Sequence, residues 1–320
     1  MIKKLITAIN NSTKIALISH ISPDGDTCGS ALALLRALEL FGKSPSIFCE
    51  NTLSKNLKTL KFSEKYCQES NEIFDLAIAV DCADFSRMGA CSNIFQRARH
   101  TVNIDHHKTN DNYAEINIVE GGVSATAEVA FKIISALNDI KNCMDDDVAR
   151  LLYTALVTDS GGFTFSSVSS QTHDIASKLI KFDINASAIC EVFLKNITYN
   201  VFTLKNLVLS GAKFFDNNKI GFIYFSKENF EKTNTDDECT TGIINNIRNV
   251  EGVKIAVSIV ETDTPNSYKV SIRTADSVDA SRIAMYFGGG GHKNASGCRV
   301  SGFFEDVKDK LLKVCRDYLV

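Results

Sequence analysis

The first half of the chain alternates short apolar runs with segments in which small and apolar residues recur at helical spacing. The apolar runs lie at residues 14–20, 46–49, 76–81, 101–105 and 116–119. The helical patterns lie at residues 26–40, 124–137 and 145–157. Such alternation is typical of α/β proteins, in which right-handed crossovers build a mostly parallel sheet. We therefore predict an α/β fold with a mostly parallel sheet for this half.

The pattern of the chain changes after Gly211. Strand-like runs come in pairs there, at residues 213–215 with 220–225 and at residues 255–260 with 268–273. Asn217-Asn218 in the first pair and Pro265 in the second pair favour the turns of two hairpins. Helical patterns accompany these runs at residues 236–246, 279–287 and 304–319. These features predict a smaller α+β domain.

The segment that joins the two halves is helical in pattern. Residues 172–209 contain no cluster of Pro or Gly, so a flexible linker is not expected. We expect an N-terminal α/β domain at residues 1–180, a helical connector at residues 181–209 and an α+β domain at residues 210–320.

The composition argues against several classes of protein. The chain has 320 residues, 44% hydrophobic and 23% charged, as expected of a globular protein with two cores. Its formal net charge of -3 differs from the basic excess of proteins that bind long nucleic acids. No run is long enough to span a membrane, and the N-terminal apolar run is too short for a signal peptide. Ten cysteines without a Cys-x-x-Cys pair favour free thiols and a cytoplasmic location.

Acidic and histidine side chains stand where several of these predicted elements end. They are His20, Asp24, Asp26, Asp81, Asp105, His106, His107 and Asp159. In an open α/β sheet, ligands bind at the carboxyl ends of the strands. We therefore expect these side chains to converge at one edge of the sheet.

Each of these residues has an ordinary explanation when it is taken alone. Asp26 could cap the helix that follows the first strand, and Asp81 could cap another helix. Glycines after Asp159 are common at helix ends, although an acid there opposes the helix dipole. Adjacent histidines on an extended chain point in different directions, so we expect His106 and His107 to have different partners. Chance does not readily explain acids at four such ends together.

Four carboxylates and two imidazoles from this set could hold metal ions. These residues are His20, Asp24, Asp26, Asp81, His106 and Asp159. Mixed oxygen and nitrogen ligands without thiolate suit Mn²⁺, and Mg²⁺ or Co²⁺ are alternatives. Two such ions, about 3.5–4 Å apart, activate water and clamp the oxygens of a phosphoryl transfer. The sequence therefore predicts two-metal phosphoryl chemistry.

Five sequence strings carry a family resemblance. His20-x-x-Pro23-Asp24-Gly25-Asp26, the Asp81 that ends an apolar run, Asp105-His106-His107 and Thr158-Asp159-Ser160-Gly161 follow one another in order. Gly288-Gly289-Gly290-Gly291-His292 lies in the second half. The chain resembles the DHH phosphoesterase superfamily with its DHH-associated C-terminal domain. Within it, the chain is similar to the bifunctional oligoribonuclease and pAp phosphatase group, which includes cyclic-di-AMP and linear-dinucleotide phosphodiesterases.

The resemblance implies a role for each matching residue. One Mn²⁺ would be held by His20, Asp24 and Asp81, and a second by Asp26, Asp81, His106 and Asp159, so that Asp81 bridges the two ions. His107, supported by Asp105, would contact the scissile phosphate. Residues that would bind the far end of the substrate are Arg273, Gly289, Gly290, Gly291 and His292. One departure is Gly162, at a position where many relatives carry Arg, so a cation near the metals is missing or comes from elsewhere.

The glycine run at residues 288–291 can also be interpreted without the family resemblance. A flexible linker is disfavoured because ordered elements flank the run closely. A P-loop is disfavoured because Gly291 is followed by His292 rather than by Lys and Ser or Thr. A better interpretation is that the glycines let backbone N–H groups approach an anion or a base closely. Arg273 could also be an ordinary surface residue.

We expect a cytoplasmic, manganese-dependent phosphodiesterase that hydrolyses short single-stranded oligonucleotides or dinucleotides, and pAp as a possible second substrate. The two domains would enclose a cleft of limited length, which excludes long duplexes. A signalling phosphodiesterase for cyclic-di-AMP, pApA or pGpG is the main alternative. A pyrophosphatase, a processive exonuclease and a non-catalytic nucleotide-binding module fit the sequence less well. A homodimer is implied by the resemblance alone.

Overall fold

The computed structural model describes residues 1–319, which form two compact units. The first unit is Met1–Asn196, and the second begins at Ile197. This boundary lies inside the segment for which a helical connector is predicted. Within residues 1–319, no helix is both long and apolar enough to cross a membrane.

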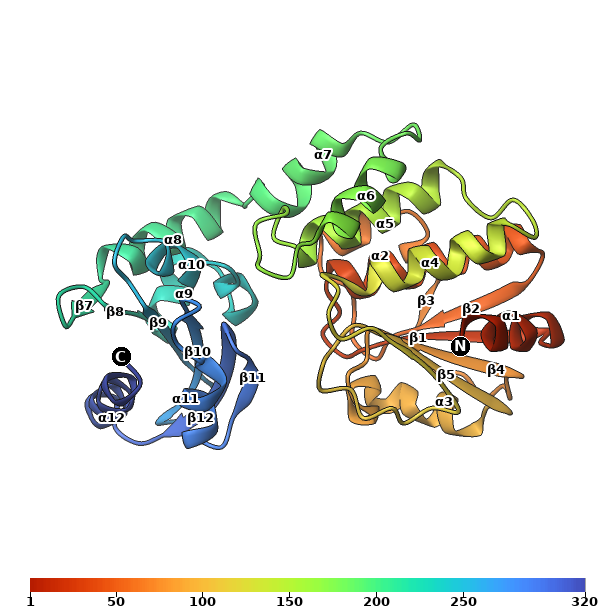
Figure 1. The fold of residues 1–320 in the computed structure, drawn as a ribbon. Helices are drawn as coiled ribbons and strands as arrows, with labels where there is room; N and C mark the ends of the chain where they lie inside the picture. Colours follow the sequence, from red (N-terminus) through yellow and green to blue (C-terminus); the bar gives the residue numbers. More distant parts are fainter. Residues whose placement is uncertain (320) are drawn as a thin grey trace. The chain divides into compact units, whose positions relative to one another are not determined.

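A six-stranded parallel sheet forms the centre of the first unit (Figure 1). Its strands are β1 (Lys14–Ser19), β2 (Ser44–Phe48), β3 (Tyr66–Cys67), β4 (Leu76–Val80), β5 (His100–Asp105) and β6 (Ile116–Val119). Their order is β3-β2-β1-β4-β5-β6, and every neighbouring pair is parallel. The predicted α/β class is confirmed. β3 was not predicted, because a strand of two residues has no periodicity.

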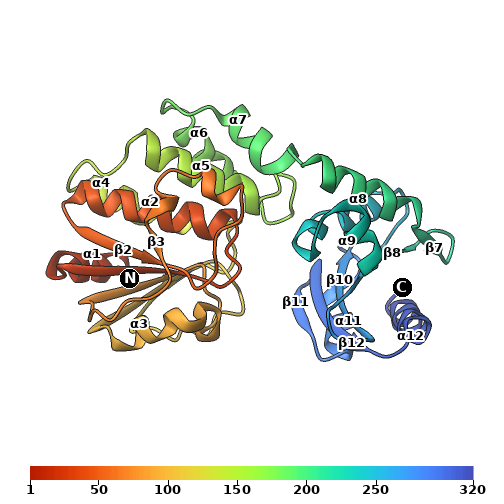
Figure 2. The same cartoon turned by 180° about the vertical axis from the view of Figure 1, so that it is seen from behind.

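Helices cover both faces of this sheet (Figures 1 and 2). They are α1 (Ile2–Asn11), α2 (Gly25–Phe41), α3 (Ser92–Arg97), α4 (Thr126–Asn138), α5 (Asp146–Asp159) and α6 (Ser170–Leu179), with 3₁₀ turns η1 (Leu57–Thr59), η2 (Ser63–Lys65) and η3 (Phe85–Cys91). One hydrophobic core joins α1, α2, α4 and α5 to one face, and a smaller one joins α3 and η3 to the other. The elements that bear the predicted site residues are therefore held by extensive packing.

The sheet order places a ligand-binding edge at the carboxyl ends of β1 and β4. The chain proceeds from β1 to β2 on one side and later returns to β4 on the other side of β1. Crevices at such a switch of direction are the usual ligand sites of open α/β sheets. His20 follows β1 directly and Asp81 follows β4 directly. The fold alone therefore brings these two side chains together.

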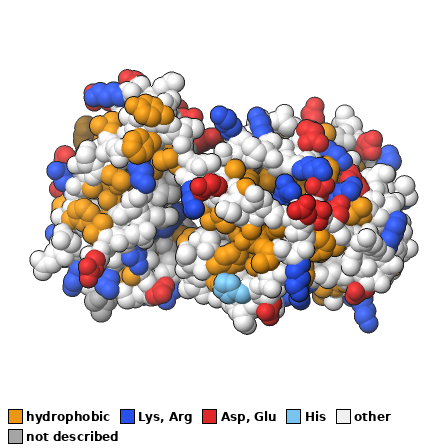
Figure 3. Space-filling view, turned by 90° about the horizontal axis from the view of Figure 1, so that it is seen from above, with side chains coloured by type: hydrophobic (Ala, Val, Ile, Leu, Met, Phe, Trp, Pro, Cys, Tyr) orange, Lys and Arg blue, Asp and Glu red, His pale blue; other side chains and the backbone are white. Residues whose placement is uncertain are grey.

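The segment at residues 172–209, which is helical in pattern, folds as several separate helical pieces. It contains α6, α7 (Ala186–Cys190), the π-helical turn η4 (Glu191–Lys195) and α8 (Tyr199–Ser210). Asn185 caps α7 and Thr198 caps α8, so each begins as a separate helix. Hydrophobic side chains of this region remain at the surface, among them Ile180 and Leu194, and Figure 3 shows hydrophobic side chains on the face seen from above.

The second unit is built on a mixed six-stranded sheet. Its strands are β7 (Lys213–Phe215), β8 (Ile220–Phe225), β9 (Ile255–Glu261), β10 (Ser267–Thr274), β11 (Gly290–His292) and β12 (Ala295–Ser301), in the order β11-β12-β10-β9-β8-β7. Both predicted hairpins are present as antiparallel pairs. The second half of the glycine run, whose backbone N–H groups are expected to approach an anion or a base, pairs with β12 as the edge strand β11.

Helices flank this second sheet on both faces. They are α9 (Lys227–Thr233), η5 (Asp237–Thr240), α10 (Ile244–Arg248), α11 (Ala280–Tyr286) and α12 (Phe304–Asp317). One core packs α11 and α12 against one face, and another packs α8 and α10 against the other. A single helix was predicted at residues 236–246, and the structure has η5 and α10 instead, separated by Gly242 with a positive φ of 79°.

Candidate metal centre

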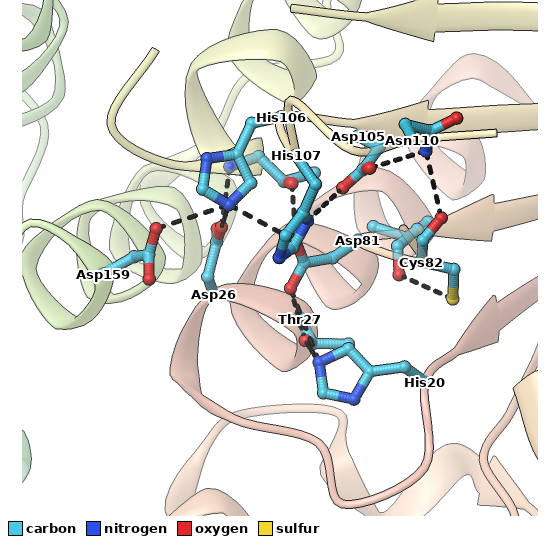
Figure 4. A network of polar contacts seen from close by, with 12 residues as sticks. His20, Asp26, Thr27, Asp81, Cys82, Asp105, His106, His107, Asn110 and Asp159 are labelled. Carbon is cyan, nitrogen blue, oxygen red and sulfur yellow. Dashed lines mark hydrogen bonds and ion pairs between the residues drawn. The ribbon is translucent and has the colours of Figure 1, made fainter. Parts of the chain in front are cut away.

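Eight predicted site residues of the first unit meet at the carboxyl end of its sheet (Figure 4). Their side chains come from the ends of β1, β4 and β5, from the first turn of α2 and from the last residue of α5. Asp24 is the N-cap of α2 and accepts a hydrogen bond of 3.0 Å from the Thr27 N–H. The capping role considered for Asp26 therefore belongs to Asp24.

One group of metal-competent atoms consists of His20, Asp24 and Asp81. Their ligand atoms all lie within 4.8 Å of one another. The Thr27 hydroxyl stands among them, 2.6 Å from His20 Nε2, 3.1 Å from Asp24 Oδ1 and 2.6 Å from Asp81 Oδ2. A hydroxyl has one hydrogen to donate. Three acceptors therefore converge on one donor.

A second group consists of Asp26, His106 and Asp159, also within 4.8 Å of one another. His106 Nε2 lies 3.4 Å from Asp159 Oδ2 and 4.0 Å from Asp26 Oδ2. It also lies 3.7 Å from Asp81 Oδ1. Asp81 is thus adjacent to both groups, with one carboxylate oxygen toward each (Figure 4).

Backbone geometry at Asp81 aims its carboxylate into this site. Its φ is +62°, a left-handed conformation that is uncommon for residues other than glycine. Asp81 N–H still donates to the Ile104 carbonyl at 2.9 Å, so the strand pairing continues up to this residue. Uncommon backbone conformations of this kind cluster at functional sites.

Asp26 is held by the N-terminus of a helix other than its own. Its two carboxylate oxygens accept hydrogen bonds from the N–H groups of Thr126 and Ala127, at 2.6 and 3.0 Å. These are unpaired donors of the first turn of α4, where the helix dipole favours a negative charge. The Thr126 hydroxyl donates to Asp81 at 2.8 Å. The start of α4 therefore fixes two of the candidate ligands.

Both candidate metal-binding histidines turn the same nitrogen toward the carboxylates. His20 Nδ1 lies 2.6 Å from the Ile21 carbonyl, and His106 Nδ1 lies 3.3 Å from the Val123 carbonyl. A carbonyl only accepts, so each Nδ1 carries the hydrogen in these contacts. Each Nε2 then offers a lone pair in the neutral ring, and fixing a metal ligand in this way is usual for histidine.

The carboxylates of the site compete for protons in the absence of a cation. Burial, together with the charges of Asp81 and Asp159, raises the pKa of Asp26 well above its ordinary value. Burial and the nearby acids raise the pKa of Asp159 to about 7, against the opposing charge of His106. Burial also disfavours an ionised Asp81, but its hydrogen bond to His20 and the neighbouring histidines lower its pKa. A divalent cation would relieve this repulsion, so the donor set fits metal ions.

His107 lies beside this set and is paired with Asp105. His107 Nδ1 is 2.7 Å from Asp105 Oδ1, and Asn110 Nδ2 donates to the other oxygen of Asp105 at 2.6 Å. Burial disfavours a charged ring, but the hydrogen bond to Asp105 and the charge of Asp81 raise the pKa of His107 to about 9. Asp105, which is fully buried, therefore keeps His107 protonated.

The two adjacent histidines have different hydrogen-bond partners, Asp105 for His107 and the Val123 carbonyl for His106, but they also approach one shared carboxylate oxygen. His107 Nδ1 and His106 Nε2 each lie 3.7 Å from the same oxygen, Asp81 Oδ1, and the rings meet edge to face at 4.7 Å. β5 ends at Asp105. The alternation of side chains in a strand therefore no longer applies to His106 and His107.

Replacing Asp105 with Asn is expected to lower the pKa of His107 from about 9 toward the ordinary histidine value near 6.5. The pKa of the folded state exceeds that of the unfolded state, so the pair stabilises the metal-free fold fully below about pH 6.5. This stabilisation is lost as the pH rises through about 9. Histidine NMR titration of metal-free protein measures the shift. Glu115→Gln is the control, because Glu115 pairs with the exposed His100 at 2.9 Å. An unchanged pKa in the Asp105 variant would refute the pairing.

Sequence reasoning missed four polar residues that contact the predicted ones: Thr27, Thr126, Asn110 and Arg87. Thr27 sits one helical position after Asp26, and Asn110 three residues after His107, spacings that could have suggested contact. The Arg87 guanidinium lies 3.3 Å from His20 Nδ1 and is a cation close to the site.

Gly162 has a φ of +67°, and a side chain there would meet Leu194 at 3.0 Å. Its backbone therefore favours glycine.

The predicted substrate-binding residues all lie in the second unit. Arg273 is opposite Ala295 in the β10–β12 pair, and His292 is opposite Ala295 in the β11–β12 pair. Directly opposed residues of antiparallel strands project from one face, so Arg273 and His292 share a face across a small side chain. Burial lowers the pKa of the Arg273 guanidinium, which donates to the Ile272 carbonyl at 3.0 Å. Gly289 and Gly291 pack too closely on β12 to accept a side chain, whereas Gly290 faces open space.

Two family profiles match the chain, one in each unit. The DHH family N-terminal domain matches residues 14–156, and the DHHA1 domain matches residues 219–320.

Relatives align over nearly the whole chain. The bifunctional oligoribonuclease and PAP phosphatase NrnA of Thermus thermophilus is 27% identical, over 100% of this chain and 94% of that protein. The enzyme of the same name from Bacillus subtilis is 24% identical, over 97% of this chain and 96% of that protein. Cyclic-di-AMP phosphodiesterase PdeA of Listeria monocytogenes is 23% identical, over 89% of this chain and 44% of that protein. The crystal structure of an exopolyphosphatase-related protein from Bacteroides fragilis has the same fold, with a TM-score of 0.92, 24% identity and coverage of 99% and 96% of the two chains.

Proposed function

Because the chain belongs to the DHH family and carries a DHHA1 domain, we propose that it is a manganese-dependent phosphodiesterase that hydrolyses short single-stranded oligonucleotides. Its relatives include enzymes named as oligoribonucleases and PAP phosphatases, which are phosphoric ester hydrolases. pAp is therefore a second candidate substrate.

One observation carries this proposal. Of three overlapping groups of metal-competent side chains, two lie on either side of Asp81, which turns one carboxylate oxygen toward each. The third group consists of Asp81, His106 and His107. Four carboxylates and two neutral imidazoles would hold two ions, the first at His20, Asp24 and Asp81. The second would be held by Asp26, Asp81, His106 and Asp159. Oxygen and nitrogen ligands without a thiolate suit Mn²⁺.

The chain's own residues have separate tasks in the hydrolysis. Divalent ions would supply a hydroxide at neutral pH and neutralise charge on the phosphoryl oxygens. His107, which Asp105 keeps protonated, can donate a hydrogen bond to a phosphate oxygen or a proton to the leaving oxygen. Thr27 and Thr126 orient the two oxygens of Asp81. Arg273 and His292 would hold the substrate's other end, because a guanidinium fits a phosphate bidentately.

A substrate panel tests the proposal. Metal-stripped protein supplied with Mn²⁺ would be assayed on RNA of two to about ten nucleotides, and on pAp, pApA, pGpG and cyclic-di-AMP. We expect turnover of the shortest RNAs to exceed that of the longest. Exclusive turnover of cyclic-di-AMP or pApA would support the signalling alternative, toward which the likeness to PdeA points. Preference for the longest RNA would contradict a short-substrate enzyme.

A further inference from the structure

The open face of the second sheet carries aligned rows of polar and small residues. Three rows follow from the strand register: Arg273, Ala295 and His292; Ser271, Gly297 and Gly290; Lys269 and Arg299. Opposed residues in antiparallel pairs project from the same face, and residues two apart in a strand do so as well. All three rows therefore lie on one face, and the third has no assigned role.

Only the part of this face formed by β10, β12 and β11 is left uncovered by helices. The intervening residues of β10 and β12, such as Val270 and Cys298, are buried against α11 and α12 on the opposite face. On the open side, Lys269 and Arg299 are exposed, and the Lys269 side chain retains 50% of its accessible surface. α8 and α10 cover the neighbouring β8 and β9. The third row is therefore accessible to a ligand.

The third row places two cations directly opposite each other. Like charges in this arrangement destabilise a strand pair unless an anion offsets them. Asp237 lies 3.7 Å from Lys269, and Arg299 forms no ion pair within the described residues 1–319. The acid therefore offsets Lys269 in part and leaves the Arg299 guanidinium available for an anion.

The spacing of the rows suits an extended polyanion. Two residues along a strand span about 6.8 Å, so the third row lies about 14 Å from the row of Arg273 and His292. Between them is a floor of small residues, and a Cβ added at Gly290 would meet no atom within 4 Å. The first and third rows thus place cations at the two ends of a stretch of small residues. This arrangement complements a nucleic acid strand, whose phosphates could contact the cations while a sugar or base lies over the small residues.

We propose that Lys269 and Arg299 form a second phosphate subsite, which binds the backbone of single-stranded oligonucleotides longer than two nucleotides. This inference rests on the proposed function and names its substrate class. The first row grips one phosphate, and the third row grips another that a dinucleotide does not reach. The guanidinium of Arg299 provides bidentate contacts, and Lys269 adds a point charge.

The test compares a dinucleotide with a pentanucleotide. In the Lys269→Gln/Arg299→Gln variant, the ratio of kcat/KM for pentamer over dimer is expected to fall about tenfold, as for the loss of one charged hydrogen-bonded contact. The steepness of the pentamer's salt dependence should fall by about 0.7, for one phosphate contact on a single strand. Lys219→Gln/Lys313→Gln is the matched control, because both lysines are exposed in the same unit and lie outside the three rows. Its ratio should equal that of the wild type.

A binding measurement separates failure of the subsite from failure of the proposed function. Anisotropy of a fluorescent pentamer in EDTA reports binding without turnover. The subsite predicts weaker binding in the Lys269→Gln/Arg299→Gln variant and tighter binding in Asp237→Asn, which releases Lys269. Unchanged pentamer binding in the double variant refutes the subsite, even if the wild type hydrolyses RNA. Weakened binding with no hydrolysis of any RNA by the metal-loaded wild type upholds the subsite and refutes the proposed function.

Discussion

Replacing Asp81 with Asn is expected to lower the turnover of a ribodinucleotide by on the order of 10³-fold or more. Among residues 1–319, Asp81 is the one carboxylate that faces both groups of candidate ligands, through Thr27 and His20 on one side and His106 on the other. Loss of the Asp81 carboxylate would therefore lower the affinity for both ions at once. Steady-state kinetics at saturating Mn²⁺, with metal affinity from calorimetry, measures the two effects.

The same variant should not unfold the protein. The charge of Asp81 contributes to the raised pKa values of Asp26 and Asp159, so its removal relieves repulsion in the metal-free site. Against this, His20 and the neighbouring histidines lower the pKa of Asp81, so its ionised form stabilises the metal-free fold. The free energy of unfolding of metal-free Asp81→Asn is therefore expected to fall below that of the wild type without loss of the fold. Asp174→Asn, an exposed acid on α6, is the control for activity. Full turnover by Asp81→Asn would rule out the bridging role.

Replacing Gly29 with Val is expected to destabilise the first unit by about 3 kcal/mol. Gly29 lies where α2 packs on α5, and an added Cβ would stand 2.7 Å from the Leu151 carbonyl oxygen and 2.8 Å from Ala155 Cβ. A helix carbonyl cannot move aside by itself, so α5 would have to shift. α2 carries Asp26 and α5 carries Asp159, so the shift would also separate two candidate ligands.

Urea unfolding of the metal-free protein measures this effect. Gly122→Val is the matched control, because Gly122 lies in an exposed loop where an added Cβ meets no atom within 4 Å. The double variant Gly29→Val/Ala155→Gly should recover part of the loss, since one of the two close contacts is removed. Equal unfolding free energies for Gly29→Val and Gly122→Val would show that α2 and α5 are not packed as described.

Much of the first unit could be predicted because apolar runs and their ends can be recognised from residues that are neighbours in the sequence. Parallel strands bury both faces, so β1, β4 and β5 stood out as continuous apolar runs, and their ends directed attention to His20 and Asp81. β3 and β11 could not be predicted in this way. Each is an edge strand of two or three residues whose pairing depends on a neighbour distant in sequence.

The roles of individual side chains depended on contacts that the sequence does not encode locally. Asp26 accepts a hydrogen bond from the N–H of Thr126, which lies 100 residues away in the sequence. The contact between Asp26 and α4 could therefore be recognised only from the fold. The convergence of His106 and His107 on Asp81 required knowing that β5 ends at Asp105. The open face of the second sheet became visible only through the register of β10, β11 and β12.

The most direct test of metal-dependent hydrolysis is the turnover of a ribodinucleotide by metal-stripped protein as Mn²⁺ is added. The two groups of ligands on Asp81 predict no turnover in chelator, and turnover that saturates as two ions bind per chain. Turnover that persists in excess EDTA, or that saturates with no ion bound, would contradict hydrolysis by two metal ions at Asp81.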